Sequence, residues 1–137
     1  RLIHTVRDPM DVGFSLWSQS FAGNHPFAYR LETIAHFQHL NDEIMAHWQA
    51  AMPGAIHTLR YEDMVADPAA ETARLLEAAG LPQDPACLDF HDSETSARTA
   101  SAYQVRQKIY SSSVGAWQRH AAALAPLRAA LETKPFT

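Results

Sequence analysis

An arginine, a helix start and a serine follow one another near the beginning of the chain, and together they could bind a phosphate group. Arg7 comes directly after the apolar stretch 2–6, and Ser15 stands eight positions further along. Asp8 and Pro9 form a typical helix start, because Asp caps the first turn and Pro suits the first helical position. Ser15 then falls two turns after the cap, on roughly the same side of the helix. A guanidinium fork and a hydroxyl could therefore converge on one oxyanion.

The same residues also have a purely structural interpretation. Arg7 could pair with Asp8 or Asp11, and Ser15 could be an ordinary helix residue. Structural ion pairs of this kind are common in proteins. The spacing of these residues leaves both interpretations open.

A second group of possible ligand contacts lies in the segment 98–117. Arg106 and Lys108 supply positive charges, and Tyr103 and Tyr110 offer flat faces on which an adenine could stack. Neutral hydrogen-bonding side chains stand among them, at Ser101, Gln104, Ser111, Ser112 and Ser113. This mixture of cations, aromatic rings and neutral donors suits a nucleotide.

Structural alternatives remain in this segment as well. Ser113 could cap a helix that begins near Val114. Trp117 is expected in the core, because a large aromatic residue in a helix usually packs against other elements.

Strands and helices alternate along the chain, and they must position these side chains. Hydrophobic runs, caps, prolines and glycines predict the elements. The expected order is a buried strand over 2–6, a helix over 9–20, a loop over 21–27, a helix over 30–51, a buried strand over 55–60, a helix over 67–79 ending at Gly80, a helical turn over 84–90, and two short helices over 114–119 and 124–131. The helix over 30–51 carries one apolar stripe, formed by Ile34, Phe37, Leu40, Ile44 and Trp48.

Strands that alternate with helices predict an α/β fold with a parallel sheet and a helix-rich C-terminal tail. Two strands are too few for a stable sheet of this kind. We therefore expect the remaining strands to lie in an N-terminal part that this sequence does not contain, so that the chain begins inside a larger protein.

Three segments resemble the sulfotransferases that use 3′-phosphoadenosine 5′-phosphosulfate (PAPS). The run R-D-P-x-D-V-x-x-S from Arg7 to Ser15 resembles their 3′-phosphate motif, in which Arg and Ser stand eight positions apart. The Y-E-D run at Tyr61 is similar to a strand end whose tyrosine lies near the adenine. The segment 98–117 is very like the tail of bacterial sulfotransferases that are often fused to tetratricopeptide repeats, and more loosely like a loop of tyrosylprotein sulfotransferases.

The resemblance implies a P-loop-NTPase-like sulfotransferase fold, of which residues 1–137 form the C-terminal part of a single domain. It implies transfer of a sulfuryl group from PAPS to a hydroxyl or amine of a small-molecule, carbohydrate or peptide acceptor, without a metal. A tetratricopeptide-repeat domain could lie upstream. The residues implied to contact the nucleotide are Arg7, Ser15, Tyr61, Ser101, Gln104, Val105, Arg106, Lys108, Tyr110 and Ser113.

The sequence departs from the family pattern at several points. The Gly-rich loop for the 5′-phosphosulfate and a segment for the catalytic base have no match here, and both lie upstream of the Arg7 motif in the family. Ala116 stands where members often carry Arg or Lys, and Gln19 stands where tyrosylprotein sulfotransferases place a further Arg. Each of these two replacements removes one possible phosphate contact.

Composition excludes or disfavours other classes of protein. The net charge of −4 disfavours a general nucleic-acid binder. The single cysteine, Cys87, is expected to be a buried thiol and fits a reducing, cytoplasmic compartment. The sequence has no apolar run of membrane-spanning length and no signal peptide. The eight histidines show no pattern that completes a metal site, and we expect Glu62 and Asp63 to pair with a nearby arginine or to cap a helical turn.

Two other functions remain open. A P-loop small-molecule kinase would need a Walker-type loop upstream and has no reason to match the segment 98–117. A non-catalytic nucleotide-binding or interaction module derived from a sulfotransferase is mildly favoured by Ala116 and Gln19.

Overall fold

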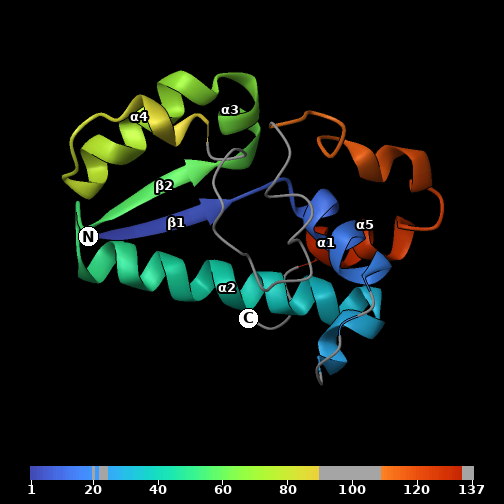
Figure 1. Cartoon of the computed structure of the whole chain (residues 1–137). Helices are drawn as coiled ribbons and strands as arrows, with labels where there is room; N and C mark the ends of the chain where they lie inside the picture. The colour runs from blue at the N-terminus through green and yellow to red at the C-terminus, as the bar shows by residue number, and fades with distance from the viewer. Residues whose placement is uncertain (20, 22–24, 90–108, 134–137) are drawn as a thin grey trace. The chain divides into compact units, whose positions relative to one another are not determined.

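Two parallel strands form the sheet, at the places where the apolar runs predict them. β1 spans Leu2–Val6 and β2 spans Ile56–Arg60, with Leu2 opposite Ile56 and Val6 opposite Arg60. The other elements of the described residues are helices (Figure 1). The predicted α/β class with a parallel sheet is therefore confirmed.

The structure is a computed structural model, and it describes residues 1–19, 21, 25–89 and 109–133. Its parts cluster into two units. The first unit combines Arg1–Val6 with Ala55–Ser111, and the second combines Arg7–Gly54 with Ser112–Thr137.

In the first unit, two helices pack against β2. α3 spans Tyr61–Ala66 and α4 spans Pro68–Ala79 (Figure 1). α4 matches the predicted helix: the Asp67 carboxylate accepts from the backbone N–H of Ala70 at 3.1 Å, and Gly80 ends the helix with φ of 75°. α3 was not expected from the sequence, because Tyr61 to Asp63 reads as the end of a strand and six residues are too few to show a helical period.

Two expectations about burial in the first unit are wrong. Leu2 and Ile3 of β1 are 51% and 46% exposed, and none of the described hydrophobic side chains of this unit is fully buried. A two-stranded sheet offers too little surface to enclose its own apolar residues. Cys87 is exposed rather than buried, because it belongs to the short 3-10 helix η2, Pro85–Cys87, within the exposed stretch 81–89.

The second unit has a helical core. Three α-helices, α1 (Pro9–Ser18), α2 (Leu31–Ala51) and α5 (Ala125–Glu132), pack together with two 3-10 helices, η1 (Pro26–Tyr29) and η5 (Ala116–His120). Five fully or nearly buried hydrophobic side chains of this unit form one cluster, made of Met10, Ile34, Ala35, Leu124 and Leu127. This cluster joins the Arg7 motif to the C-terminal tail.

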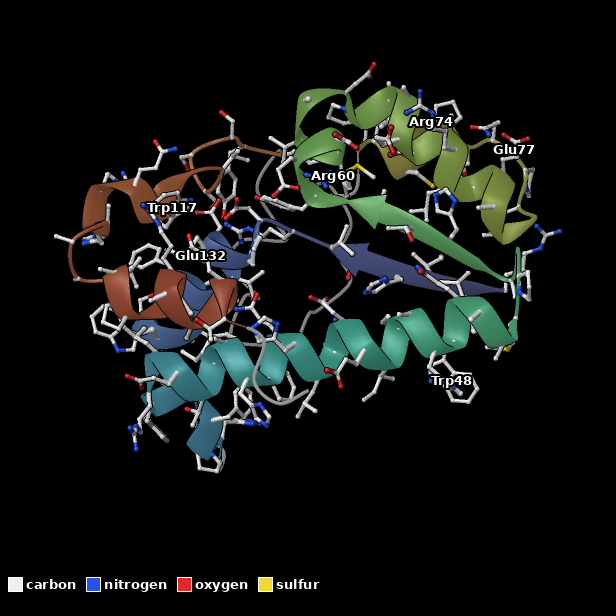
Figure 2. The ribbon with its side chains drawn as sticks, turned by 180° about the vertical axis from the view of Figure 1, so that it is seen from behind. Trp48, Arg60, Arg74, Glu77, Trp117 and Glu132 are labelled. Atoms are coloured by element: carbon white, nitrogen blue, oxygen red, sulfur yellow. The ribbon has the colours of Figure 1, made fainter. Side chains whose placement is uncertain are left out.

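Only the N-terminal part of the α2 stripe enters this core. Ile34 is fully buried, whereas Phe37, Leu40, Ile44 and Trp48 are each 42–55% exposed. The ring of Phe37 stacks on Phe27 of η1, with centroids 4.2 Å apart. Trp48 projects outward from its helix (Figure 2). None of the helices in the described ranges is long and apolar enough to cross a bilayer.

Gly13 allows α1 and α5 to approach closely. A Cβ at this position would overlap the Cδ2 atom of Leu127, whose side chain is fully buried. We expect Gly13→Ala to lower the free energy of unfolding by about 1–2 kcal/mol, because overpacking outweighs the better helix propensity of Ala. Chemical denaturation of the variant would measure this loss.

A double-mutant cycle tests the cause. In a Leu127→Ala background the overlap is gone, so Gly13→Ala should become neutral or stabilising there. An equal cost in both backgrounds would rule out the close approach as its origin.

Candidate functional site

Arg7 lies between the end of β1 and the start of α1, directly after the last residue of the strand. Its Nη2 atom donates a 2.6 Å hydrogen bond to the backbone carbonyl of Ser113, 106 positions away. The Arg7 side chain remains 23% exposed. Of the residues expected to contact the nucleotide, Arg7 and Ser113 are thus brought together by the fold.

Asp11, in the first turn of α1, connects the same two segments. Its side chain is fully buried, and it accepts hydrogen bonds from the backbone N–H groups of Gly115 at 2.6 Å and Trp117 at 3.1 Å. Its Oδ2 lies 3.9 Å from Nη2 of Arg7. We call the bonds of Arg7 to Ser113, and of Asp11 to Gly115 and Trp117, the tail clasp.

The backbone of Gly115 is shaped for this contact. Gly115 has φ of 68°, a left-handed conformation that residues with a Cβ adopt only with strain. It also occupies the N-cap position of η5. The alternative in which Ser113 caps the helix is therefore wrong, because the helix begins after Gly115 and makes no side-chain cap.

Aromatic contacts hold η5 against the helical core. The ring of His120 stacks on Phe14 of α1, with centroids 4.7 Å apart. Trp117, labelled in Figure 2, packs against the core cluster, as expected. The guanidinium of Arg128 lies 4.8 Å from the centre of the Trp117 ring. These contacts fix the C-terminal side of the turn that carries Ser113.

Ser15 lies one helical turn beyond Asp11 and is exposed. Asp8 caps α1 as predicted, since its carboxylate accepts from the backbone N–H groups of Met10 at 2.9 Å and Asp11 at 3.0 Å. Asp8 thus caps the start of α1, and Asp11 binds the helix to the C-terminal tail. The side chain of Ser15, on the same helix, is exposed to solvent.

The remaining site residues belong elsewhere in the chain. Tyr61 opens α3, and it and Tyr110 are partly buried in the first unit. Arg60 pairs with Glu62 at 3.6 Å and Asp63 at 3.8 Å, as expected for structural carboxylates. The other expected contacts lie outside the described residues, namely Ser101, Gln104, Val105, Arg106 and Lys108.

The second unit contains groups of the kind that bind oxyanions. Arg7 has a partly exposed side chain whose guanidinium carries five N–H donors, and Ser15 has an exposed hydroxyl-bearing side chain on the helix that follows. The structural interpretation of Arg7 also holds in part, because Arg7 does lie beside Asp11. Within the described ranges, no three His, Cys, Asp or Glu side chains come together to hold a metal ion.

Asp11 is the residue of this site whose importance the sequence did not indicate. The sequence offered it only as a possible partner of Arg7. Its place four positions after Arg7 was a usable signal, since an acidic residue in the first turn of a helix can pair with a basic residue just before that helix. Its two backbone partners follow more than 100 positions later, and no local pattern announces them.

We expect Asp11→Asn to lower the free energy of unfolding by about 1.5–3 kcal/mol, the range for hydrogen bonds to charged groups. The carboxamide has one oxygen for two N–H donors, and it brings N–H groups of its own into a buried site. Chemical denaturation would measure the loss. Asp42→Asn is the matched control, because Asp42 is exposed on α2 and should change stability by less than about 0.5 kcal/mol. Equal effects of the two substitutions would contradict a stabilising clasp.

Comparison with known proteins identifies the family of the chain. The sequence matches the model of the sulfotransferase family over residues 1–85, which contain Arg7, Ser15 and Tyr61. An uncharacterized protein of Aquifex aeolicus (strain VF5) is 35% identical over 130 residues, which cover 93% of this chain and 17% of that protein. No solved structure matches the sequence significantly. The family match extends over more than half of the chain, and the chain belongs to the sulfotransferase family.

Proposed function

We propose that the full protein transfers a sulfuryl group from PAPS to a hydroxyl or amine acceptor, and that this chain binds the 3′-phosphate and the adenine of the donor. The observation that carries the proposal is the bond from Arg7 to the Ser113 carbonyl, at 2.6 Å. It joins the two segments that resemble the nucleotide-binding parts of the family. The family match over residues 1–85 supports sulfotransfer in general.

In this proposal, Arg7 and Ser15 bind the 3′-phosphate. The guanidinium fork donates to the phosphate oxygens, and the exposed hydroxyl of Ser15 adds a further donor. Tyr61 lies by the adenine, and the segment from Ser101 to Tyr110 wraps the nucleotide. These contacts involve no metal ion.

The reaction itself is an in-line displacement at sulfur. The acceptor oxygen or nitrogen attacks the sulfur, the bond from sulfur to the 5′-phosphate oxygen breaks, and adenosine 3′,5′-bisphosphate (PAP) leaves with the bonding electrons. A general base takes the acceptor proton. Positively charged groups and backbone donors stabilise the charge that develops on the leaving phosphate. We assign the base and the 5′-phosphosulfate loop to a part of the protein other than this chain.

The partners and the location belong to the same proposal. The acceptor is a small molecule, a carbohydrate or a peptide, and a tetratricopeptide-repeat domain upstream could present it. We propose a bacterial, cytoplasmic protein. Because this chain covers 17% of its Aquifex relative, these statements concern a longer protein.

Calorimetric titration of the full-length protein tests the nucleotide assignment. PAP should bind much more tightly than adenosine 5′-phosphosulfate, which lacks the 3′-phosphate. Arg7→Ala should weaken PAP binding by about 1.5–3 kcal/mol, or about 10- to 150-fold, because hydrogen bonds to a charged group are lost. Binding of adenosine 5′-phosphosulfate should hardly change.

Arg30→Ala is the matched control, because Arg30 is exposed and pairs only with Glu32 among the ion pairs of the described residues. A PAP affinity that is insensitive to Arg7→Ala would remove Arg7 from the site. Release of PAP from PAPS with an acceptor mixture then distinguishes an enzyme from a non-catalytic module, which would bind PAP without turnover. Ala116 and Gln19 are the residues that favour the module.

Ser15→Ala should weaken PAP binding about 2- to 10-fold, the equivalent of one hydrogen bond of about 0.5–1.5 kcal/mol. The free energy of unfolding should stay within about 0.5 kcal/mol, because the side chain is exposed. Ser18→Ala is the control, since the Ser18 hydroxyl donates to the backbone carbonyl of Ser15 and lies one turn further along the same helix. Equal PAP affinities for both variants would show that Ser15 has no role in binding.

A further inference from the structure

The carboxylate of Asp11 is fully buried, and its partners are backbone groups of a distant segment. It accepts from the N–H groups of Gly115 and Trp117, which follow it by 104 and 106 positions. A buried carboxylate is stable only when its oxygens are paired, so these two bonds define one arrangement of the turn. The turn from 113 to 117 is therefore fixed relative to the first turn of α1.

Arg7 is held in the same arrangement. Its Nη2 atom donates to the Ser113 carbonyl at 2.6 Å and lies 3.9 Å from Oδ2 of Asp11. A long arginine side chain in solution has many rotamers, and ordering it opposes binding. In the second unit, much of that ordering is completed before any ligand arrives, because the carbonyl acceptor is itself fixed by Asp11 through Gly115.

We propose that Asp11 is a positioning residue for the 3′-phosphate of the nucleotide. It does not touch the nucleotide, and it acts by holding Arg7 and the 113–117 turn in the geometry that receives the phosphate. This inference rests on the proposed function, because it assumes that Arg7 binds the 3′-phosphate. The phosphate then meets an arginine side chain that is already ordered, and such preorganisation increases affinity.

Asp11→Asn in the full-length protein tests this role. The dissociation constant of PAP should rise about tenfold, whereas that of adenosine 5′-phosphosulfate should stay within a factor of two. Both are measured by calorimetry at a temperature at which circular dichroism shows the variant to be folded. A purely stabilising role of Asp11 would leave the ratio of the two dissociation constants unchanged. Asp42→Asn should leave both constants unchanged, because Asp42 is exposed on α2.

Gly115→Ala gives an independent test that keeps the charged groups of Arg7 and Asp11. If Asp11→Asn does not fold, this variant alone tests the positioning role. A methyl group strains the left-handed turn that aims the Gly115 N–H at Asp11, and it would lie 3.4 Å from Nε2 of Gln118. The PAP constant should rise several-fold relative to that of adenosine 5′-phosphosulfate. Gly54→Ala is the matched control, because Gly54 has φ of 75° and nothing within 4 Å of the added methyl.

The outcomes separate this inference from the proposed function. A wild-type protein that binds PAP no better than adenosine 5′-phosphosulfate overturns the proposed function and this inference with it. A wild-type protein that prefers PAP, with the same preference in both folded variants, overturns the inference alone. A smaller preference for PAP in Asp11→Asn and Gly115→Ala, but in neither control, supports the positioning role.

Discussion

The buried carboxylate of Asp11 is the constraint on which the proposed site depends. It is fully enclosed, and it binds two backbone N–H groups of the C-terminal tail while lying 3.9 Å from the guanidinium of Arg7. Removing a charge from water is costly, and the cost is offset only when the surrounding groups keep one geometry. That geometry joins segments more than 100 positions apart, so the Arg7 motif and the tail form one structure.

The helical core of the second unit holds the helices that carry the Asp11 contacts. Met10 of α1, Ile34 of α2 and Leu127 of α5 pack in one buried cluster, and Gly13 lets α1 approach α5 closely. Two side chains of α2 add polar ties: Gln38 donates to the Pro9 carbonyl at 3.2 Å, and a ring nitrogen of His39 lies 3.1 Å from the Ala130 carbonyl. α1, which carries Ser15 and follows Arg7 in the chain, is thus held in place by α2 and α5. The match to the sulfotransferase family covers residues 1–85, which include both Arg7 and Ser15.

Local patterns predicted most of the elements, because each had a nearby physical signal. Asp8 and Pro9 start α1, Asp67 and Pro68 start α4, and Gly80 ends it in a left-handed conformation.

The predictions from the sequence failed where burial depends on distant partners. Apolar residues of β1 and of the α2 stripe are exposed in the described structure, Cys87 is exposed, and α3 has too few residues to show a period. The tail clasp was not predicted for the same reason. In the sequence Gly115 resembles any turn glycine, and nothing near it indicates that its N–H donates to Asp11. The nucleotide contacts expected at Ser101, Gln104, Val105, Arg106 and Lys108 stay predictions.

The most direct test of the central claim is amide hydrogen exchange of the full-length protein with PAP and with adenosine 5′-phosphosulfate, at saturating concentrations of each. We expect PAP to slow exchange in residues 7–15 and 111–117 more than the ligand without a 3′-phosphate does, because only PAP has the phosphate that Arg7 would bind. Exchange elsewhere should respond equally to both ligands. Equal protection of these two segments by both nucleotides, or protection by neither, would contradict the assignment of the 3′-phosphate site to Arg7 and Ser15.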